Sequence, residues 1–492
     1  MKTPSVIQTL KLSERDAGWS PFWISAWLLA LWVLIPAVFE GSQIHDSLEQ
    51  LIWGQSFEWG YWKHPPLTSW LVWLANWVMP QPYLSTYLLG LLCAWVTLWA
   101  TWRIAEMLFD KTTADLTVVM MTLHFGFTRR AAVYNHNTVL IGMVALCVLV
   151  LLIALKREQW RWWLLLGLSS GAALLTKYQA GIPMVGVFAV LMLSGQAAKY
   201  WRQLMVAALV AVLVVLPHVH WMYQHHFETI GYAMSYADGA VIGDSAATRL
   251  YKFFGGQLRF VLLPLVFMLA AFALVRGAKR TSSDLTTEQR NWLLGLIAVP
   301  LLIFSVLAVF FGVRLQSYWG LQTSQFIPLL FAVWLRRASL DWSVWYTRLW
   351  LGLAAGSLAV FLAQESGWMS NPSQGAELKG YPAKEIADEA LAHWRAQTQC
   401  SLQYVSGEMA PAAMVVGYAS EKGVLALQDG DFRKSPWIDP DDMRRHGFLE
   451  LRLFKDAAPA SDAKLHHNKY RAEDSPIRLG VTYHAPQEAC AH

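Results

Sequence analysis

The run from Thr138 to Leu155 reads Thr-Val-Leu-Ile-Gly-Met-Val-Ala-Leu-Cys-Val-Leu-Val-Leu-Leu-Ile-Ala-Leu and contains no charged residue. About 18 or more such residues suffice for a helix to cross the hydrocarbon core of a bilayer. The composition points the same way, because 55% of the 492 residues are hydrophobic and 15% are charged. Soluble domains usually carry roughly 25% charged residues. The sequence therefore predicts an all-α polytopic membrane bundle.

Similar apolar runs recur along most of the chain. The segment 67–79 is short and bounded by prolines, so we expect it to lie at the membrane interface. The first run is not followed by a cleavage site of small residues, which predicts a retained helix instead of a signal peptide. In all, the sequence predicts about eleven spans, near 20–39, 83–102, 115–128, 138–155, 162–176, 180–195, 204–221, 257–275, 291–311, 324–335 and 347–363.

The distribution of basic residues predicts the orientation of the bundle. If the N-terminus is cytoplasmic, the cytoplasmic loops are consistently basic, as the positive-inside rule requires. An odd number of spans then places the first loop, 40–67, and the C-terminal region outside. The basic residues of the cytoplasmic loops are Arg103, Lys111, Lys156, Arg157, Arg161, Lys199, Arg202, Arg276, Lys279, Arg280, Arg290, Arg336 and Arg337.

The composition changes after Gln364. Residues 366–492 are polar, carry charges of both signs and contain no apolar span, which divides the chain into a transmembrane domain, 1–365, and a small external α/β domain. The expected elements of that domain are an amphipathic helix over 383–397, strands over 402–405, 413–418 and 449–453, and a loop over 435–442 that leads into a helix.

The four cysteines divide between these two parts of the chain. Cys93 and Cys147 lie within predicted spans, where a free cysteine packs as a small hydrophobic side chain. Cys400 and Cys490 lie in the external domain and could form a disulfide if that compartment is oxidising.

The first external loop holds the residues most suited to chemistry. It contains His45-Asp46-Ser47-Leu48-Glu49, followed by Tyr61-Trp62-Lys63-His64-Pro65-Pro66-Leu67. Carboxylates are costly inside a bilayer, and acidic groups held at its edge usually mark a site. On a helix Asp46 and Glu49 share a face, although the same spacing also fits a capping box. The two prolines keep the chain extended, so they either present Lys63 and His64 to a cleft or form a simple turn.

Several cations fall near the external face, where topology does not favour them. Any one of them could snorkel or pair with a nearby acid. Together they predict an electropositive cleft, because Lys and Arg are the usual partners of phosphate. They are Lys63, Arg129, Arg130, Lys177, Arg249, Lys252, Arg259 and Arg314.

Neither a firm metal motif nor a nucleic-acid partner is indicated. The histidines at 218, 220, 225 and 226 surround the end of a span without a firm ligand spacing, and the sequence contains no CxxC or HExxH motif. We therefore assign no metal ligands, and a divalent cation stays open. The net charge of +5 is too small to favour nucleic acid.

Taken in order, these motifs resemble the bacterial glycosyltransferase family 39-like membrane enzymes of the GT-C superfamily, which include the aminoarabinose transferases of lipid A. The resemblance covers about residues 20–365. It rests on Asp46-Ser-Leu-Glu49, Trp59-Gly-Tyr-Trp-Lys-His-Pro-Pro-Leu67 and Leu174-Leu-Thr-Lys-Tyr178, with support from 217–227 and 253–258.

The resemblance implies a GT-C-type bundle of a bacterial inner membrane, with a catalytic first loop and a periplasmic C-terminal domain. Such enzymes take a sugar from a polyprenyl phosphate and pass it, with inversion of the anomeric centre, to an acceptor. Here the acceptor would be lipid A, lipopolysaccharide or a related glycan of the cell envelope, and membrane lipids would surround the enzyme.

The resemblance also assigns roles to residues. By position, Asp46 matches the catalytic acid of the first loop and would act as general base, while Glu49 would orient a cation or the sugar. Asn137 stands where many relatives carry a second acid, which weakens the case for a tightly bound metal. The donor phosphate would be bound by Lys63, His64, Arg129, Lys177 and Arg314, and the substrates would be contacted by Tyr61, Asn137, Tyr178 and Tyr318.

Two other functions stay open. A transporter or flippase of lipid-linked sugars would have ionisable groups near the centres of spans and internally repeated halves, and the sequence shows no obvious repeat. A non-catalytic scaffold would leave the loop carboxylates and the external cations without a role. The glycosyltransferase is the leading hypothesis.

Overall fold

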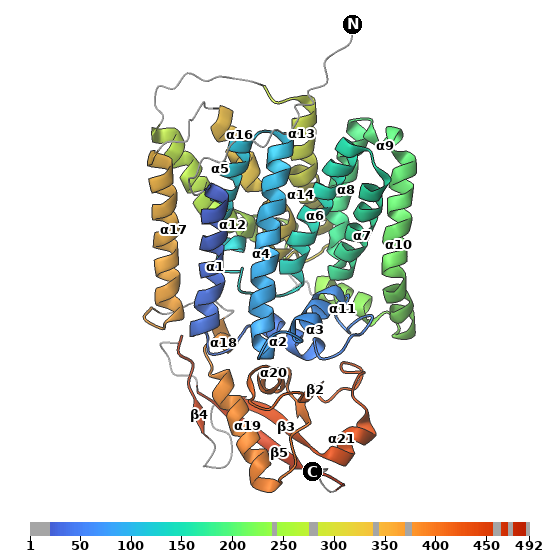
Figure 1. Cartoon of the computed structure of the whole chain (residues 1–492), viewed down its shortest axis with the longest axis vertical. Coiled ribbons are helices and arrows are strands. Elements are labelled where there is room, and N and C mark those ends of the chain that lie inside the picture. The colour runs from blue at the N-terminus through green and yellow to red at the C-terminus, as the bar shows by residue number, and fades with distance from the viewer. Residues whose placement is uncertain are drawn as a thin grey trace.

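The computed structural model describes residues 20–238, 244–274, 284–337, 344–369, 376–455, 464–470 and 476–488. Long helices stand side by side in a bundle, and a small domain that contains a sheet lies against one end of it (Figure 1). The predicted all-α bundle with a small C-terminal α/β domain is therefore confirmed.

The bundle is built from helices of very different lengths. They are α1 Pro21–Phe39, α2 His45–Trp53, α3 Leu67–Ala75, α4 Pro82–Leu108, α5 Lys111–Met121, η1 Phe125–Phe127, α6 His136–Arg157, α7 Trp160–Thr176, η2 Tyr178–Ala180, α8 Gly181–Leu193, α9 Gln196–Lys199, α10 Trp201–Gln224, α11 Glu228–Asp238, α12 Ala246–Leu274, α13 Thr287–Leu293, η3 Leu294–Ala298, α14 Val299–Phe310, η4 Ser317–Gly320, α15 Leu321–Ser324, α16 Ile327–Arg337 and α17 Val344–Glu365.

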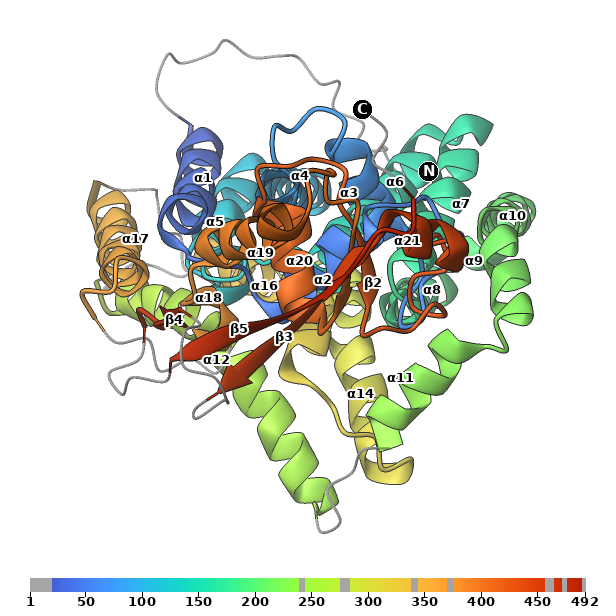
Figure 2. The ribbon, with the colours of Figure 1, turned by 90° about the horizontal axis from the view of Figure 1, so that it is seen from below.

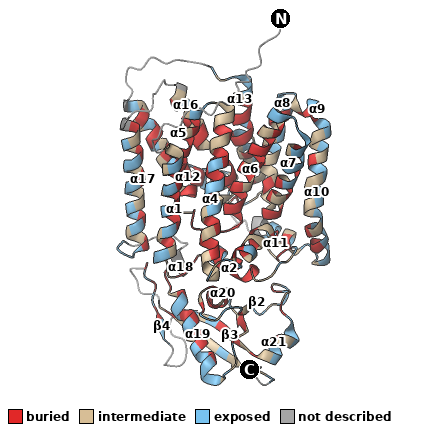
Figure 3. Cartoon of the chain, in the orientation of Figure 1, coloured by how far each residue is buried: buried red, intermediate tan, exposed pale blue. Residues whose placement is uncertain are grey.

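Among the described residues, seven helices are long and apolar enough to cross a membrane. They are 21–39, 82–108, 136–157, 201–224, 246–273, 287–310 and 346–365. Several other predicted spans form shorter helices, such as α8 and α16, so the number of eleven spans stays a prediction. The outer faces of α1, α10 and α17 are largely exposed (Figure 3), and large apolar side chains such as Trp27 and Leu209 point outward there. Lipid would cover these faces in a bilayer.

The C-terminal domain is a five-stranded mixed sheet with helices. Its elements are α18 Ala376–Lys379, α19 Ala383–Gln397, β1 Tyr404–Gly407, α20 Met409–Tyr418, β2 Leu425–Gln428, α21 Pro440–His446, β3 Phe448–Lys455, β4 Leu465–His466 and β5 Ile477–His484. The strand order is β2-β1-β3-β5-β4. β1 pairs in parallel with β2 and β3, and β5 pairs antiparallel with β3 and β4.

One predicted element of this domain is wrong. The segment 413–418, expected as a strand, lies within helix α20. A short apolar run cannot be told from a buried helix by periodicity alone, and a connection between parallel strands such as β1 and β2 usually contains a helix. The helix at 383–397 and the strand at 449–453 are confirmed as α19 and β3.

The remaining expectations for the domain are met to different degrees. The strand expected at 402–405 begins two residues late, as β1. Asp439 caps α21 by accepting hydrogen bonds from Asp441 N and Asp442 N, which confirms the helix, although it begins at Pro440, within the segment predicted as loop. Cys400 is disulfide-bonded, while Cys490 lies outside the described residues. Cys93 and Cys147 are free thiols.

The first loop of the bundle shares a hydrophobic core with the C-terminal domain. Leu48, Leu51 and Trp53 of α2 are fully buried in a cluster that also contains Leu391 of α19 and Met414 of α20. Nearby, the ring of Tyr83 on α4 stacks on Tyr418 with the centroids 4.5 Å apart. Seen from below, α2 lies beside α20 and β2 near the middle of the molecule (Figure 2). The domain therefore supports the loop that carries Asp46 and Glu49.

Candidate active site

Asp46 lies in the first turn of α2, with its side chain about half exposed. The helix is capped by the backbone of Ile44, and no side chain caps it. The capping box considered for Asp46 and Glu49 is therefore not formed, and the Asp46 carboxylate is available for other contacts.

Asn135 holds that carboxylate in place. Its Nδ2 donates a hydrogen bond to Asp46 Oδ2 at 3.0 Å. The Oδ1 of the same side chain caps α6 by accepting from Asn137 N at 2.9 Å and Thr138 N at 3.1 Å. Because both ends of the amide are engaged, the carboxylate is fixed where the N-termini of α2 and α6 meet. Helix N-termini favour negative charge.

Two cations act on Asp46 from other elements. Lys177, which follows α7, and Arg130, which precedes α6, both interact electrostatically with its carboxylate. Burial lowers the pKa of Lys177 to about 8, although Asp46 acts in the opposite direction. The ammonium donates to Asn137 Oδ1 at 2.9 Å, and Arg130 lies 5.5 Å from the centroid of the Tyr318 ring. Lys177 thus links Asp46 with Asn137, Arg130 links Asp46 with Tyr318, and the predicted roles of these residues stay predictions.

Glu49 is placed differently from Asp46, although both belong to α2. Its side chain is 5% exposed and accepts from Lys63 Nζ at 2.8 Å. It also accepts from Gln428 Nε2 of β2 at 2.9 Å, while Gln428 Oε1 accepts from Trp53 Nε1 at 2.9 Å. Glu49 and Lys63 therefore form a buried ion pair that joins the first loop to the C-terminal domain.

His64 lies against His136, with ring centroids 3.9 Å apart. Burial, together with the nearby His136, Lys177 and Lys63, lowers the pKa of His64 well below its usual range. The imidazole is therefore neutral at physiological pH and brings no positive charge to the cleft. Its predicted contact with phosphate stays a prediction.

The other predicted residues lie around this group or away from it. Arg129 points to α17, 5.5 Å from the ring centroid of Phe361, and Arg314 is exposed between α14 and η4. Tyr61 is 2% exposed and donates to Ser56 O at 2.7 Å. Tyr178 Oη lies 2.8 Å from His218 Nε2 and 2.9 Å from Thr229 Oγ1. These contacts give Tyr61 and Tyr178 packing roles, and their predicted contacts with substrate stay untested.

The sequence predicts no specific contact for three residues that structure the site. Arg130 was grouped with Arg129, yet Arg130 is the one that acts on Asp46. Asn135 has a helix-cap pattern, an Asn directly before an apolar run, which could have marked it. Gln428 lies 379 positions from its partner Glu49, and no local pattern links them. Among the described residues, no three His, Cys, Asp or Glu side chains gather to hold a metal ion.

Comparison with known sequences gives two partial matches. A family model described as dolichyl-phosphate-mannose-protein mannosyltransferase matches residues 63–221, which include Lys63 and Lys177 but not Asp46. The chain is also 22% identical, over 307 residues, to the lipid A galacturonosyltransferase RgtD of Rhizobium johnstonii. That match covers 62% of this chain and 63% of the relative, so it spans less than two thirds of the relative's length.

Solved structures show a likeness over nearly the whole chain. The crystal structure of ArnT from Cupriavidus metallidurans bound to undecaprenyl phosphate superposes with a TM-score of 0.61, and the apo state with 0.57. In both cases the identity is 12%, and the match covers 93% of this chain and 96% of the other. The chain therefore has the fold of ArnT, and the resemblance to GT-C enzymes is confirmed at the level of the fold.

Proposed function

We propose that this chain is a membrane glycosyltransferase that moves a sugar from a polyprenyl phosphate to a lipid A-like acceptor of the cell envelope. The observation that carries the proposal is the half-exposed Asp46 carboxylate, which is fixed by Asn135 and lies under the influence of Lys177 and Arg130. The likeness to a lipid A galacturonosyltransferase and to ArnT bound to undecaprenyl phosphate supports these substrate classes.

In this proposal a hydroxyl of the acceptor attacks the anomeric carbon of the donor sugar. Its proton passes to the carboxylate of Asp46, and the bond between the anomeric carbon and the phosphate oxygen breaks, with the electron pair leaving on the phosphate. Attack on the side opposite the leaving group inverts the anomeric centre. Lys177 and Arg130 stabilise the charge that grows on the phosphate, because cations held in a site of low dielectric act strongly on developing charge.

Glu49 and Lys63 have supporting roles in this proposal. Each neutralises the other inside the protein, so neither brings a net charge to the substrates. Gln428 and Lys63 hold Glu49 in place, and Glu49 belongs to the same helix as Asp46. The pair therefore keeps α2 in position.

The proposed reaction takes place on the periplasmic side of a bacterial inner membrane. The basic cytoplasmic loops support that orientation, and the sheet domain lies at the same end of the bundle as Asp46, since α2 packs on α20. Both would face the periplasm, with the N-terminus in the cytoplasm.

The test compares envelope glycolipids, by mass spectrometry, from cells with the intact gene and cells with a deletion. We expect one sugar-sized mass to be missing from a lipid A-like glycolipid after deletion. Purified protein in nanodiscs should then restore that mass when it is given a polyprenyl-phosphate sugar. Loss of the glycolipid in cells without transfer by the purified protein would favour a transporter of lipid-linked sugars and contradict the proposal.

The depressed pKa of Lys177 predicts a pH dependence of donor binding. The ammonium is charged below about pH 8 and loses its proton above it, so its attraction for phosphate weakens as the pH rises. We expect the KM for the donor to be constant up to about pH 7 and to rise by up to about tenfold per pH unit above 8. In Lys177→Arg this rise should disappear, since a guanidinium stays charged. An identical rise in both proteins would contradict this role.

A further inference from the structure

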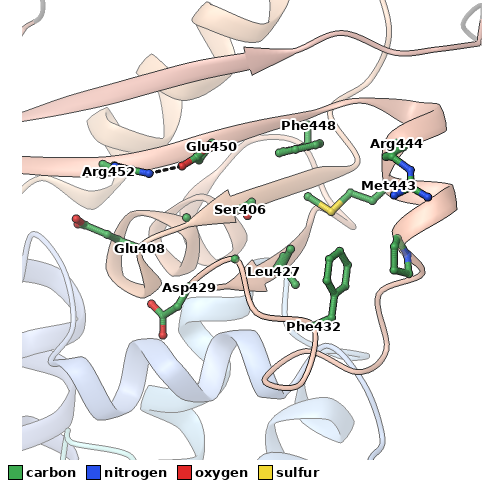
Figure 4. Close-up of a pocket in the computed structure, with 13 residues that line it drawn as sticks. Ser406, Glu408, Leu427, Asp429, Phe432, Met443, Arg444, Phe448, Glu450 and Arg452 are labelled. Atoms are coloured by element: carbon green, nitrogen blue, oxygen red, sulfur yellow. Dashed lines mark hydrogen bonds and ion pairs between the residues drawn. The ribbon is translucent and has the colours of Figure 1, made fainter.

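A cavity of about 570 Å³ opens on the sheet of the C-terminal domain, outside the site described above. Its floor is formed by one residue from each of the parallel strands β2, β1 and β3, namely Leu427, Ser406 and Glu450. Ser406 is paired in register with Leu427 on one side and with Glu450 on the other. The volume falls within the range of small-molecule pockets. Figure 4 shows these side chains with Phe432, Met443 and Phe448 around the same space.

The cavity lies where the topology of the sheet reverses. β1 has β2 on one side and β3 on the other. The connecting helices pack on opposite faces, because α20 clusters with Val405 and Leu449 whereas Met443 of α21 clusters with Leu427 and Phe448. In open α/β sheets, ligands bind at such switch points, outside the carboxyl ends of the strands.

Ser406 supplies an independent indication of a ligand. The residue is 5% exposed and lies on the floor of the cavity, where Figure 4 places it near the centre. Its hydroxyl makes no hydrogen bond to any described residue, and Gly430 lies beside it. A hydroxyl can both donate and accept a hydrogen bond, so a polar group of a ligand in the cavity is its natural partner.

The charges of the cavity favour a neutral ligand with many hydroxyls over an ion. Glu450 is paired with Arg452 at 2.7 Å, and Asp429 with Lys434 at 2.8 Å. Glu408 Oε2 accepts from Leu453 N at 3.0 Å. The charges of Glu450 and Asp429 are therefore already compensated, the carboxylate of Glu408 is held by a backbone N–H, and all three keep lone pairs for hydroxyl donors.

The other side of the cavity is apolar. Phe432, Met443 and Phe448 line it, with Phe432 on an exposed loop. A sugar ring combines an apolar face with a rim of hydroxyls, and an aromatic side chain offers a flat surface for that face. The two halves of the cavity match such a ring.

We propose that this cavity binds a sugar unit in the headgroup of the acceptor glycolipid. The inference rests on the proposed function, because that function supplies a glycolipid acceptor. The position supports it: Gln428, between the lining residues Leu427 and Asp429, donates to Glu49 on the helix that carries Asp46. The acceptor headgroup thus lies on the domain that supports the catalytic loop, and recognition of its sugar is separate from the site of proton transfer.

The test measures direct binding of a soluble glucosamine disaccharide, without acyl chains or phosphates, to the full-length protein in nanodiscs. Two variants probe the cavity. Phe432→Ala removes the aromatic surface, and binding should weaken about five- to tenfold. Ser406→Ala removes a hydroxyl that makes no bond within the described protein, so thermal stability should not fall while binding weakens about fivefold. The matched control is Phe454→Ala, since Phe432 and Phe454 are 38% and 40% exposed and Phe454 lies outside the cavity.

The outcomes separate this proposal from the proposed function. Weaker binding in both cavity variants with unchanged binding in Phe454→Ala supports a sugar site. Equal binding in all proteins, no binding to the unmodified protein, or displacement of the disaccharide by inorganic phosphate would each overturn it. Binding that depends on Phe432, found in a protein that transfers no sugar, would keep the sugar site and refute the glycosyltransferase.

Discussion

Asp46→Asn should lower the turnover of sugar transfer by about 10²- to 10⁴-fold, the scale of a lost general base. An amide keeps the size of the carboxylate and can still accept the hydrogen bond from Asn135 Nδ2, but it cannot take the proton of the acceptor hydroxyl. The KM values for both substrates should change little, because the substituted group mainly acts in the transition state. Steady-state kinetics of the purified protein in nanodiscs measure both constants.

Folding of this variant should be nearly unaffected. The Asp46 side chain is about half exposed, and surface substitutions usually change stability by no more than about 0.5 kcal/mol. The matched control is Glu58→Gln, which changes another acid of the same loop; its carboxylate accepts from Ser56 Oγ at 2.8 Å. Its turnover should stay near that of the unmodified protein. If Asp46→Asn kept more than a tenth of the turnover, Asp46 would not be the base.

The fold was predictable largely because hydrophobic patterning is a local property. Uncharged runs such as 138–155 predict spans from composition and length alone, and the loss of such runs after Gln364 predicts a separate domain. The error at 413–418 has the opposite origin. Whether that short apolar run becomes a strand or the helix α20 depends on the parallel pairing of β1 with β2. That pairing is a tertiary contact, which local sequence does not determine.

The candidate site was predictable only in part, for a similar reason. Asp46 and Glu49 share one helix, and the sequence assigned both to catalysis. The two residues differ in what packs on them. The side chain of Asp46 is left half exposed, whereas that of Glu49 is covered by Lys63 and by Gln428 of the C-terminal domain. Arg129 and Arg130 diverge in the same way, since adjacent residues outside regular helix can point to different neighbours. Local spacing contains no information about these partners.

Lys63→Met should destabilise the protein by about 3–5 kcal/mol, the usual cost of removing one partner of a buried ion pair. The side chains of Lys63 and Glu49 are 13% and 5% exposed, so the remaining Glu49 charge would be buried, with Gln428 as its one remaining donor in the part of the chain that the structure describes. Denaturant or thermal unfolding of the purified protein measures the loss. The control is Lys384→Met, whose pair with Asp388 is 68% and 47% exposed and should contribute less than about 1 kcal/mol.

A second substitution decides whether Lys63 also binds phosphate. In Lys63→Met combined with Glu49→Gln no unpaired charge is left buried, so much of the lost stability should return. If the pair only holds α2 in place, the KM for the donor should return to the value of the unmodified protein as the stability recovers. A lysine that binds the donor phosphate would behave differently: the double variant would be stable but keep a KM raised about tenfold or more, as expected when one charged partner of a phosphate is lost. We expect both the stability and the KM for the donor to recover, because the ammonium of Lys63 lies 2.8 Å from the buried Glu49 carboxylate and is neutralised by it.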